Sequence, residues 1–279
     1  MKFACQDDRC YYTSDELPFD GFVKTGKLAV WQLLKLLEGS RHQRGKHGPE
    51  AKYNEQYLLF VRSQTIEIFP AFYSKLSANR PVRIVSSCSY IGKTSYCIDE
   101  ELFDLLTNEL LERSSYHAVV VSKETRRPIA IPRETSQAVI QPRDGKRPLP
   151  DPTFPRRPSQ HFTHRRAVMA SDTDANKHFN QAGYLLFSLD CISLAAIAGS
   201  LSAFKTDISF YNAKKVWVRY LNEAIVGEEV TISCWEDEEC RHTIWVELTK
   251  GSKVIGQCQL QFYEDSTNKD IESLPQAKL

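Results

Sequence analysis

Apolar and polar positions along the chain predict one helix followed by several strands in its first part. Residues 28–37 (LAVWQLLKLL) form an apolar run typical of a helix, with Gly39 as its stop and a basic loop over residues 40–54. Runs rich in β-branched and aromatic residues then predict strands at 57–69, 82–98 and 116–121. The leucines between 102 and 111 fit either a helix or a strand with a turn.

The second part of the chain repeats this plan. A short strand at 165–170 leads into a polar loop, and an apolar run from Leu185 to Phe204 predicts a buried helix. Four strand-like runs follow, at 207–221, 228–235, 242–248 and 253–263. A helix followed by antiparallel strands, occurring twice, predicts an α+β fold with an internal repeat.

A proline-rich segment, residues 132–160, separates the two parts. It holds seven of the thirteen prolines and is predicted to be an extended linker, because proline disrupts helices and interior strands. The wider segment 124–166 carries ten Lys and Arg against four Asp and Glu. This charge fits a solvated linker, and it also fits a surface that meets phosphates or an acidic partner protein.

The composition indicates an ordinary globular protein. Hydrophobic residues make up 42% and charged residues 25% of the 279 positions, and the net charge of +1 gives no indication of nucleic-acid binding. The eight cysteines show no zinc spacing, and the N-terminal residues lack the apolar core of a secretory signal, so we expect reduced intracellular thiols and no metal. Residues 184–204 are long enough to span a bilayer, but their serines and missing basic flanks favour a buried helix.

The polar loop before that helix, residues 171–180 (SDTDANKHFN), concentrates candidate chemistry. It brings two carboxylates, two amides and an imidazole into ten positions. Asp, Asn and Ser favour helix N-caps, and a helix that begins here directs the positive end of its dipole at the loop. A general base and a polarised carbonyl could therefore meet at this point.

This loop, together with Tyr184, resembles the active-site loop of hotdog-fold thioesterases. It is similar above all to plant acyl-ACP thioesterases, D-x-D-x-N-x-H-x-N, and to the looser D-x-D-x-x-x-H-x-N-x-x-x-Y of the 4-hydroxybenzoyl-CoA thioesterase group. The resemblance implies a tandem (double) hotdog fold, in which an antiparallel sheet wraps a long central helix in each domain. We expect a substrate-shaping N-terminal hotdog at 1–131, the linker at 132–160, a catalytic hotdog at 161–264 and a polar tail at 265–279.

The resemblance also assigns roles to the loop residues. Asp174 stands where the family has its attacking carboxylate, as general base or nucleophile, and without the family it would be an ordinary capping Asp. Asn176 and His178 match the catalytic amide and imidazole, whereas a lone His in a polar loop is otherwise a surface residue. Asn180 and Tyr184 are assigned to substrate binding, with shaping of the loop as the alternative.

A second match lies far along the chain. Tyr220-Leu221-Asn222-Glu223-Ala224 resembles the family's Tyr-Arg-Arg-Glu-Cys, which implies that Glu223 is a catalytic carboxylate or a partner that orients His178. The plain alternative is a solvated Glu at a strand end. Because Ala224 stands where the plant enzymes have Cys, the resemblance implies a carboxylate and water mechanism, without a thiol nucleophile.

We therefore predict a thioesterase that hydrolyses fatty acyl thioesters, acyl-CoA favoured over acyl-ACP, with no cofactor and no metal. The alternatives are a non-catalytic hotdog protein that binds acyl thioesters or lipids, and a hotdog hydratase or dehydratase. The C-terminal Ala277-Lys278-Leu279 resembles a peroxisomal signal, so a peroxisomal location is expected, and otherwise a cytoplasmic one. Monomer and homodimer both stay open, and we expect neither a membrane span nor nucleic acid as a partner.

Overall fold

The computed structural model describes residues 2–6, 9–49, 51, 57–131, 150–174 and 177–264. The chain divides into two compact units. The first comprises Met1–Phe22 and Gln32–Thr153, and the second comprises Val23–Trp31 and Phe154–Leu279. Residues 23–31 thus group with the second unit, where Lys24 forms an ion pair with Asp207 at 2.9 Å. The predicted linker lies largely outside the described residues.

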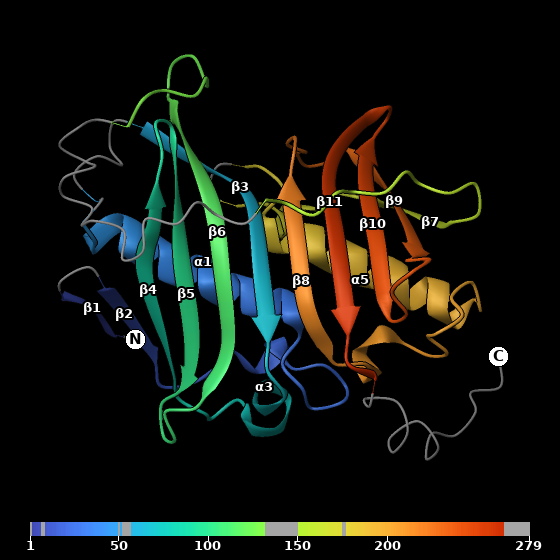
Figure 1. Ribbon diagram of the computed structural model, residues 1–279, viewed down its shortest axis with the longest axis horizontal. Coiled ribbons are helices and arrows are strands. Elements are labelled where there is room, and N and C mark those ends of the chain that lie inside the picture. Colours follow the sequence, from blue (N-terminus) through green and yellow to red (C-terminus); the bar gives the residue numbers. More distant parts are fainter. Residues whose placement is uncertain are drawn as a thin grey trace. The chain divides into compact units, whose positions relative to one another are not determined.

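The first unit contains six antiparallel strands and all but the first two residues of the long helix α1 (Val30–His47), with α3 (Pro70–Lys75) as a short second helix. The strands are β1 (Lys2–Gln6), β2 (Arg9–Ser14), β3 (Tyr57–Ile68), β4 (Val82–Ile91), β5 (Ser95–Asp104) and β6 (Leu110–Ser122). They are ordered β1-β2-β4-β5-β6-β3 (Figure 1). The hairpin β1–β2 was not predicted. It places Cys5 directly opposite Cys10, and these two form a disulfide, which corrects the expectation that all cysteines are free.

Helix α1 is longer than predicted, because it continues through Gly39 and the basic stretch to His47. The prediction that the helix stops at Gly39 was wrong, because tertiary contacts extend the helix beyond this residue. Arg41 points inward and binds the buried carboxylate of Glu100 on β5 at 2.6 Å, and Arg44 donates to the carbonyl oxygen of Ser86 on β4 at 3.1 Å. In the sequence these basic side chains indicate a loop. In the structure they bind the helix to its sheet.

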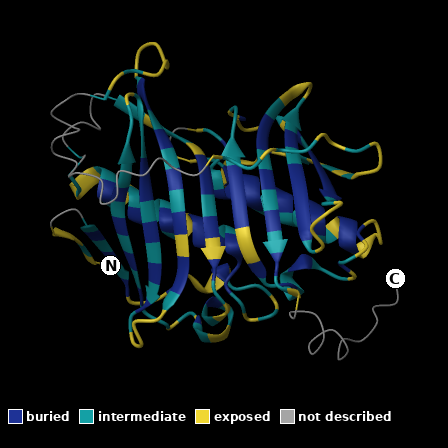
Figure 2. Ribbon diagram, in the orientation of Figure 1, coloured by how far each residue is buried: buried dark blue, intermediate teal, exposed yellow. Residues whose placement is uncertain are grey.

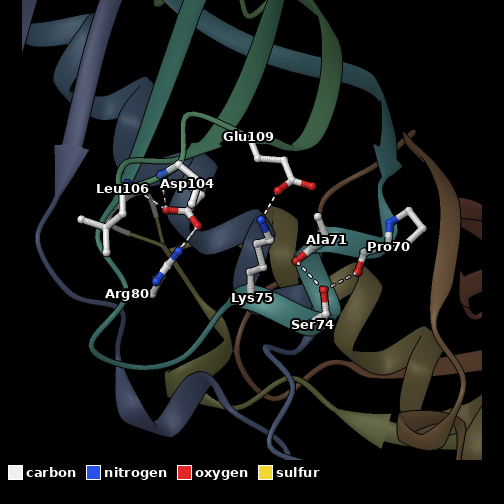
Figure 3. Close-up of polar contacts among 9 residues, drawn as sticks. Pro70, Ala71, Ser74, Lys75, Arg80, Asp104, Leu106 and Glu109 are labelled. Carbon is white, nitrogen blue, oxygen red and sulfur yellow. Dashed lines mark hydrogen bonds and ion pairs between the residues drawn. The ribbon is translucent and has the colours of Figure 1, made fainter.

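The run predicted as a single strand over 82–98 forms two strands, β4 and β5. The ambiguous leucines at 102–111 lie in the end of β5, a turn and the start of β6, as one of the two alternatives proposed. Asp104 fastens this turn: its carboxylate accepts bonds from Arg80 and from the backbone N–H of Leu106 (Figure 3). Burial alone would raise the pKa of Asp104, but these hydrogen bonds outweigh it and hold the pKa below its ordinary value.

The second unit contains five further antiparallel strands and the helix α5 (Gln181–Ile197). Its strands are β7 (Phe162–Ala167), β8 (Ala213–Tyr220), β9 (Glu229–Glu236), β10 (Thr243–Lys250) and β11 (Lys253–Phe262), in the order β8-β11-β10-β9-β7. Helix α5 contacts all five strands and is largely buried (Figure 2). It ends before the predicted 204, and Gly199 follows with a positive φ of 71°. Among the helices of the described segments, none has the length and apolar character needed to cross a membrane.

The described end of the linker lies against the second unit. Phe154 contacts three tryptophans of its sheet, Trp217, Trp235 and Trp245, with ring centroids 5.3–6.5 Å away. Arg157 adds an ion pair with Glu247 at 3.3 Å. Apolar contact and charge therefore hold this part of the linker on the sheet, where the sequence alone predicted an extended linker.

Candidate functional site

The polar loop forms a small hairpin that places Asp174 and His178 opposite each other. Thr173 and Phe179 form an antiparallel bridge at its base. At the tip, the backbone N–H of Asp174 donates to the carbonyl oxygen of His178 at 2.9 Å, and the N–H of His178 donates to Asp174 Oδ1 at 3.2 Å. Lys177 adopts a positive φ of 65° to close the turn. The carboxylate and the imidazole are thus brought to one end of the hairpin.

Two side chains anchor the base of this hairpin. Asp172 is buried, accepts the N–H of Met169 at 2.9 Å and lies 3.7 Å from Arg166 of β7. Asn180 is the N-cap of α5, because its Oδ1 accepts the N–H of Gly183 at 2.7 Å. This cap satisfies a backbone donor at the start of the helix and directs the positive end of α5 toward the loop.

Three aromatic rings, those of Phe179, Tyr184 and Phe187, form an aromatic cluster that packs the loop against α5. Phe179 of the loop lies 4.6 Å from Tyr184 and 4.7 Å from Phe187 of α5, between ring centroids. Two glycines make room for these rings. A Cβ at Gly183 would lie 2.4 Å from Phe179, and one at Gly256 of β11 would lie 2.6 Å from Tyr184. The close approach therefore requires glycine at both positions.

Tyr184 connects this aromatic cluster to the segment that carries Glu223. Its hydroxyl donates to the carbonyl oxygen of Asn222 at 2.7 Å. Burial, followed by the nearby carboxylate of Glu223, raises the pKa of Tyr184, so the phenol stays neutral and keeps its proton for this bond. The bond positions the residue that precedes Glu223.

The hairpin is paired with the segment that follows β8, which brings His178 to Glu223. His178 and Ile225 form an antiparallel bridge, and the N–H of Phe179 donates to the carbonyl oxygen of Ala224 at 2.8 Å. His178 Nδ1 lies 3.5 Å from Glu223 Oε1. The two side chains are 26% and 46% exposed, so they contact each other while both remain open to a ligand.

The structure thus brings together three of the predicted catalytic residues, Asp174, His178 and Glu223, although Glu223 is 45 positions away from His178 in the chain. Asn176 lies outside the described residues. Asn180 caps the helix and Tyr184 is buried beneath the loop, and their assignment to substrate binding stays a prediction. No group of three or more potential metal ligands occurs in the segments described above.

The arrangement can activate water. An imidazole that contacts one carboxylate through Nδ1 can accept a proton at its other nitrogen, and Asp174 supplies a second carboxylate on the same hairpin. The positive end of α5 lies directly after the loop, where it favours negative charge that develops on a carbonyl oxygen. Ala224 is fully buried and offers no thiol at this place.

Solved structures of known enzymes share this fold over almost the whole chain. The 12:0-ACP thioesterase from Umbellularia californica aligns with a TM-score of 0.75 and 12% identity, covering 94% of this chain and 99% of that one. An acyl-ACP thioesterase from Bacteroides thetaiotaomicron aligns with a TM-score of 0.71 and 17% identity, covering 92% and 98%. The fold is that of the hotdog thioesterases. No family model matches the sequence, and no curated protein sequence matches it significantly.

The sequence did not identify the two glycines that make room for the aromatic cluster. In the sequence, Gly183 lies between the loop and Tyr184 without an assigned role, and Gly256 lies inside the strand predicted at 253–263. A signal was available for Gly256, because glycine inside a strand pattern indicates close approach by another group. Its partner, Tyr184, could not be identified before the two elements were placed together.

Proposed function

We propose that this protein is a fatty acyl thioesterase built from two hotdog domains, with one active site on the second unit. The observation that carries the proposal is the contact between His178 and Glu223 at 3.5 Å, beside Asp174 on the same hairpin. A fold shared with acyl-ACP thioesterases supports it. The sequence of the first unit holds no second D-x-D-x-x-x-H loop, so its proposed role is to shape the acyl site.

The proposed reaction is hydrolysis by water. A carboxylate or the His178 imidazole accepts a proton as the water oxygen bonds to the thioester carbonyl carbon. The resulting oxyanion is stabilised by backbone N–H groups and by the dipole at the start of α5. The carbon–sulfur bond then breaks, the carbonyl re-forms, and the thiolate takes up a proton. The products are a free fatty acid and a thiol.

The proposed substrate is an acyl-CoA. A peroxisomal location, inferred from Ala277-Lys278-Leu279, would supply CoA esters of fatty acids. Acyl-ACP is the second candidate, since both solved structures compared above are described as ACP thioesterases. The acyl chain length is left to experiment.

The test measures thiol release from acyl-CoAs of short to very long chains, and from matching acyl-ACPs, for the wild type and for Asp174→Ala. We expect release that depends on chain length and that falls by about a hundredfold or more in the variant, because a general base or nucleophile is lost. The control variant is Glu124→Ala, because Glu124 is exposed. Asp237→Ala would not serve as a control, because the Asp237 carboxylate accepts the indole N–H of Trp245.

Two outcomes would contradict the proposal. Wild-type protein that binds an acyl thioester and releases no thiol from any ester would be a binding protein. Release that is unchanged in Asp174→Ala and in a His178→Ala variant would place the reaction elsewhere on the chain.

A further inference from the structure

The segment between β8 and β9, residues 221–228, carries Glu223 and must hold it at one place for the proposed reaction. Glu223 itself is 46% exposed and lies in this connecting segment, which is called the turn below, where a side chain gains little orientation from packing. The precision of the site therefore depends on what fixes this turn.

One ion pair holds both ends of the turn. Lys250, the last residue of β10, donates from Nζ to the two carboxylate oxygens of Glu228 at 2.8 and 3.0 Å. The same Nζ lies 3.3 Å from the carbonyl oxygen of Glu223. Glu228 in turn accepts the backbone N–H of Ile225 at 2.9 Å. The ammonium group and the carboxylate thus bind the peptide groups on either side of Ala224.

The same turn holds His178 from its other side. His178 forms an antiparallel bridge with Ile225, and the N–H of Phe179 donates to the carbonyl oxygen of Ala224. A change in the position of Ala224 and Ile225 therefore moves the backbone that carries His178 as well as the one that carries Glu223. Both members of the 3.5 Å contact depend on one short turn.

We propose that Lys250 and Glu228 are positioning residues for the His178–Glu223 pair. Neither touches the reacting atoms; they act by fixing the turn that both site residues share. The inference rests on the proposed function for its consequence in catalysis, and on the described contacts alone for the coupling between the ion pair and the site.

The charges fit this role. The hydrogen bond from Lys250, followed by the bond from the Ile225 N–H, lowers the pKa of Glu228, so its carboxylate is ionised at neutral pH. Lys250 and Glu228 are 32% and 31% exposed, and exposed ion pairs contribute little to the free energy of unfolding. Loss of the pair should thus change the site far more than it changes the stability of the fold.

The chain offers a matched control. Lys75 and Glu109 form another Lys–Glu pair of similar exposure, which belongs to the first unit (Figure 3). The experiment compares Lys250→Met, Glu228→Gln and the conservative Lys250→Arg with Lys75→Met. Each protein is tested for kcat and KM with the best acyl-CoA, for its melting temperature, and by NMR for the amide signals of residues 222–226 and the ring signals of His178.

We expect Lys250→Met and Glu228→Gln to lower kcat about ten- to a hundredfold with KM within about threefold, because misplacement of catalytic groups acts mainly on the reacting geometry. The amide signals of 222–226 and the His178 ring should shift together, and the melting temperature should stay close to that of Lys75→Met. Lys250→Arg should recover most of kcat, since a guanidinium can bind both oxygens of Glu228.

The inference is overturned if kcat and the His178 signals in Lys250→Met match those in Lys75→Met. Its failure is distinguishable from failure of the proposed function. A wild type without thiol release contradicts the thioesterase, while the NMR comparison still decides whether the ion pair fixes His178 and Glu223.

Discussion

At the scale of single residues, Glu112 on β6 has an unusual environment for a carboxyl group. It is fully buried, and neither of its oxygens has a hydrogen-bond partner in the described part of the chain. Burial raises its pKa well above the ordinary value, and the nearby carboxylate of Glu100 adds repulsion. The group is therefore protonated over a wider pH range in the folded protein than in the unfolded chain.

This residue gives a prediction for stability against pH. The folded state holds the proton of Glu112 more tightly than the unfolded state, so the free energy of unfolding falls as pH rises above the ordinary value of 4.5 toward the raised pKa. Glu112→Gln should remove this part of the slope, because the amide does not titrate. Urea unfolding across pH 4 to 8 measures it, with exposed Glu124→Gln as the control. A slope equal to that of the wild type in Glu112→Gln would contradict the prediction.

At the scale of secondary-structure elements, two glycines have opposite effects on the stability of the elements that contain them. Gly39 lies inside α1, and a Cβ there would meet only the Tyr12 hydroxyl, at 3.9 Å. Gly256 lies inside β11, and a Cβ there would lie 2.6 Å from the Tyr184 ring. The first glycine is a cost to its helix, and the second is a requirement of packing.

Alanine at the two positions should therefore have effects of opposite sign. Gly39→Ala should raise the free energy of unfolding by about 0.5–1 kcal/mol, because alanine favours the helix and restricts the unfolded chain. Gly256→Ala should lower it by about 1–3 kcal/mol through overpacking against Tyr184, and thiol release should fall with it. Chemical unfolding of both variants checks the pair. Equal effects would show that the Tyr184 ring yields to the added methyl group.

At the scale of the whole molecule, the linker is part of the fold where it is described. Phe154 contacts three tryptophans on β8, β9 and β10, and aromatic contacts of this kind add to the burial of apolar surface. The second unit therefore includes the end of the segment that the sequence predicts to be only a spacer.

The contribution of this contact can be measured. Phe154→Ala should lower the free energy of unfolding by about 2 kcal/mol, less than for a fully buried Phe because the side chain is only partly buried. The tryptophan emission should shift to the red, and proteolysis near residues 150–158 should become faster. Phe19→Ala, at an 84% exposed position, should leave all three unchanged. A stability equal to that of the wild type would show that the linker end is not held by this ring.

Much of the fold could be predicted from local patterns. The strands of the second unit and the start of α5 depend on alternation, turn residues and the cap at Asn180, which short stretches of sequence specify. The end of α1 could not be predicted, since Arg41 and Arg44 acquire buried partners only when β4 and β5 lie beneath the helix. The peroxisomal location stays a prediction, because Ala277-Lys278-Leu279 lies outside the described residues.

The sequence by itself determined the chemistry that is available to this protein. The loop from Asp172 to Asn180, its resemblance to the hotdog thioesterases and the Ala224 substitution all depend on residue identity and spacing along the chain. Only the tertiary structure decided which groups meet. His178 reaches Glu223 because the loop hairpin pairs with the turn after β8, and Lys250 reaches that turn from the end of β10. Contacts between distant segments depend on how strands align, which local spacing does not encode.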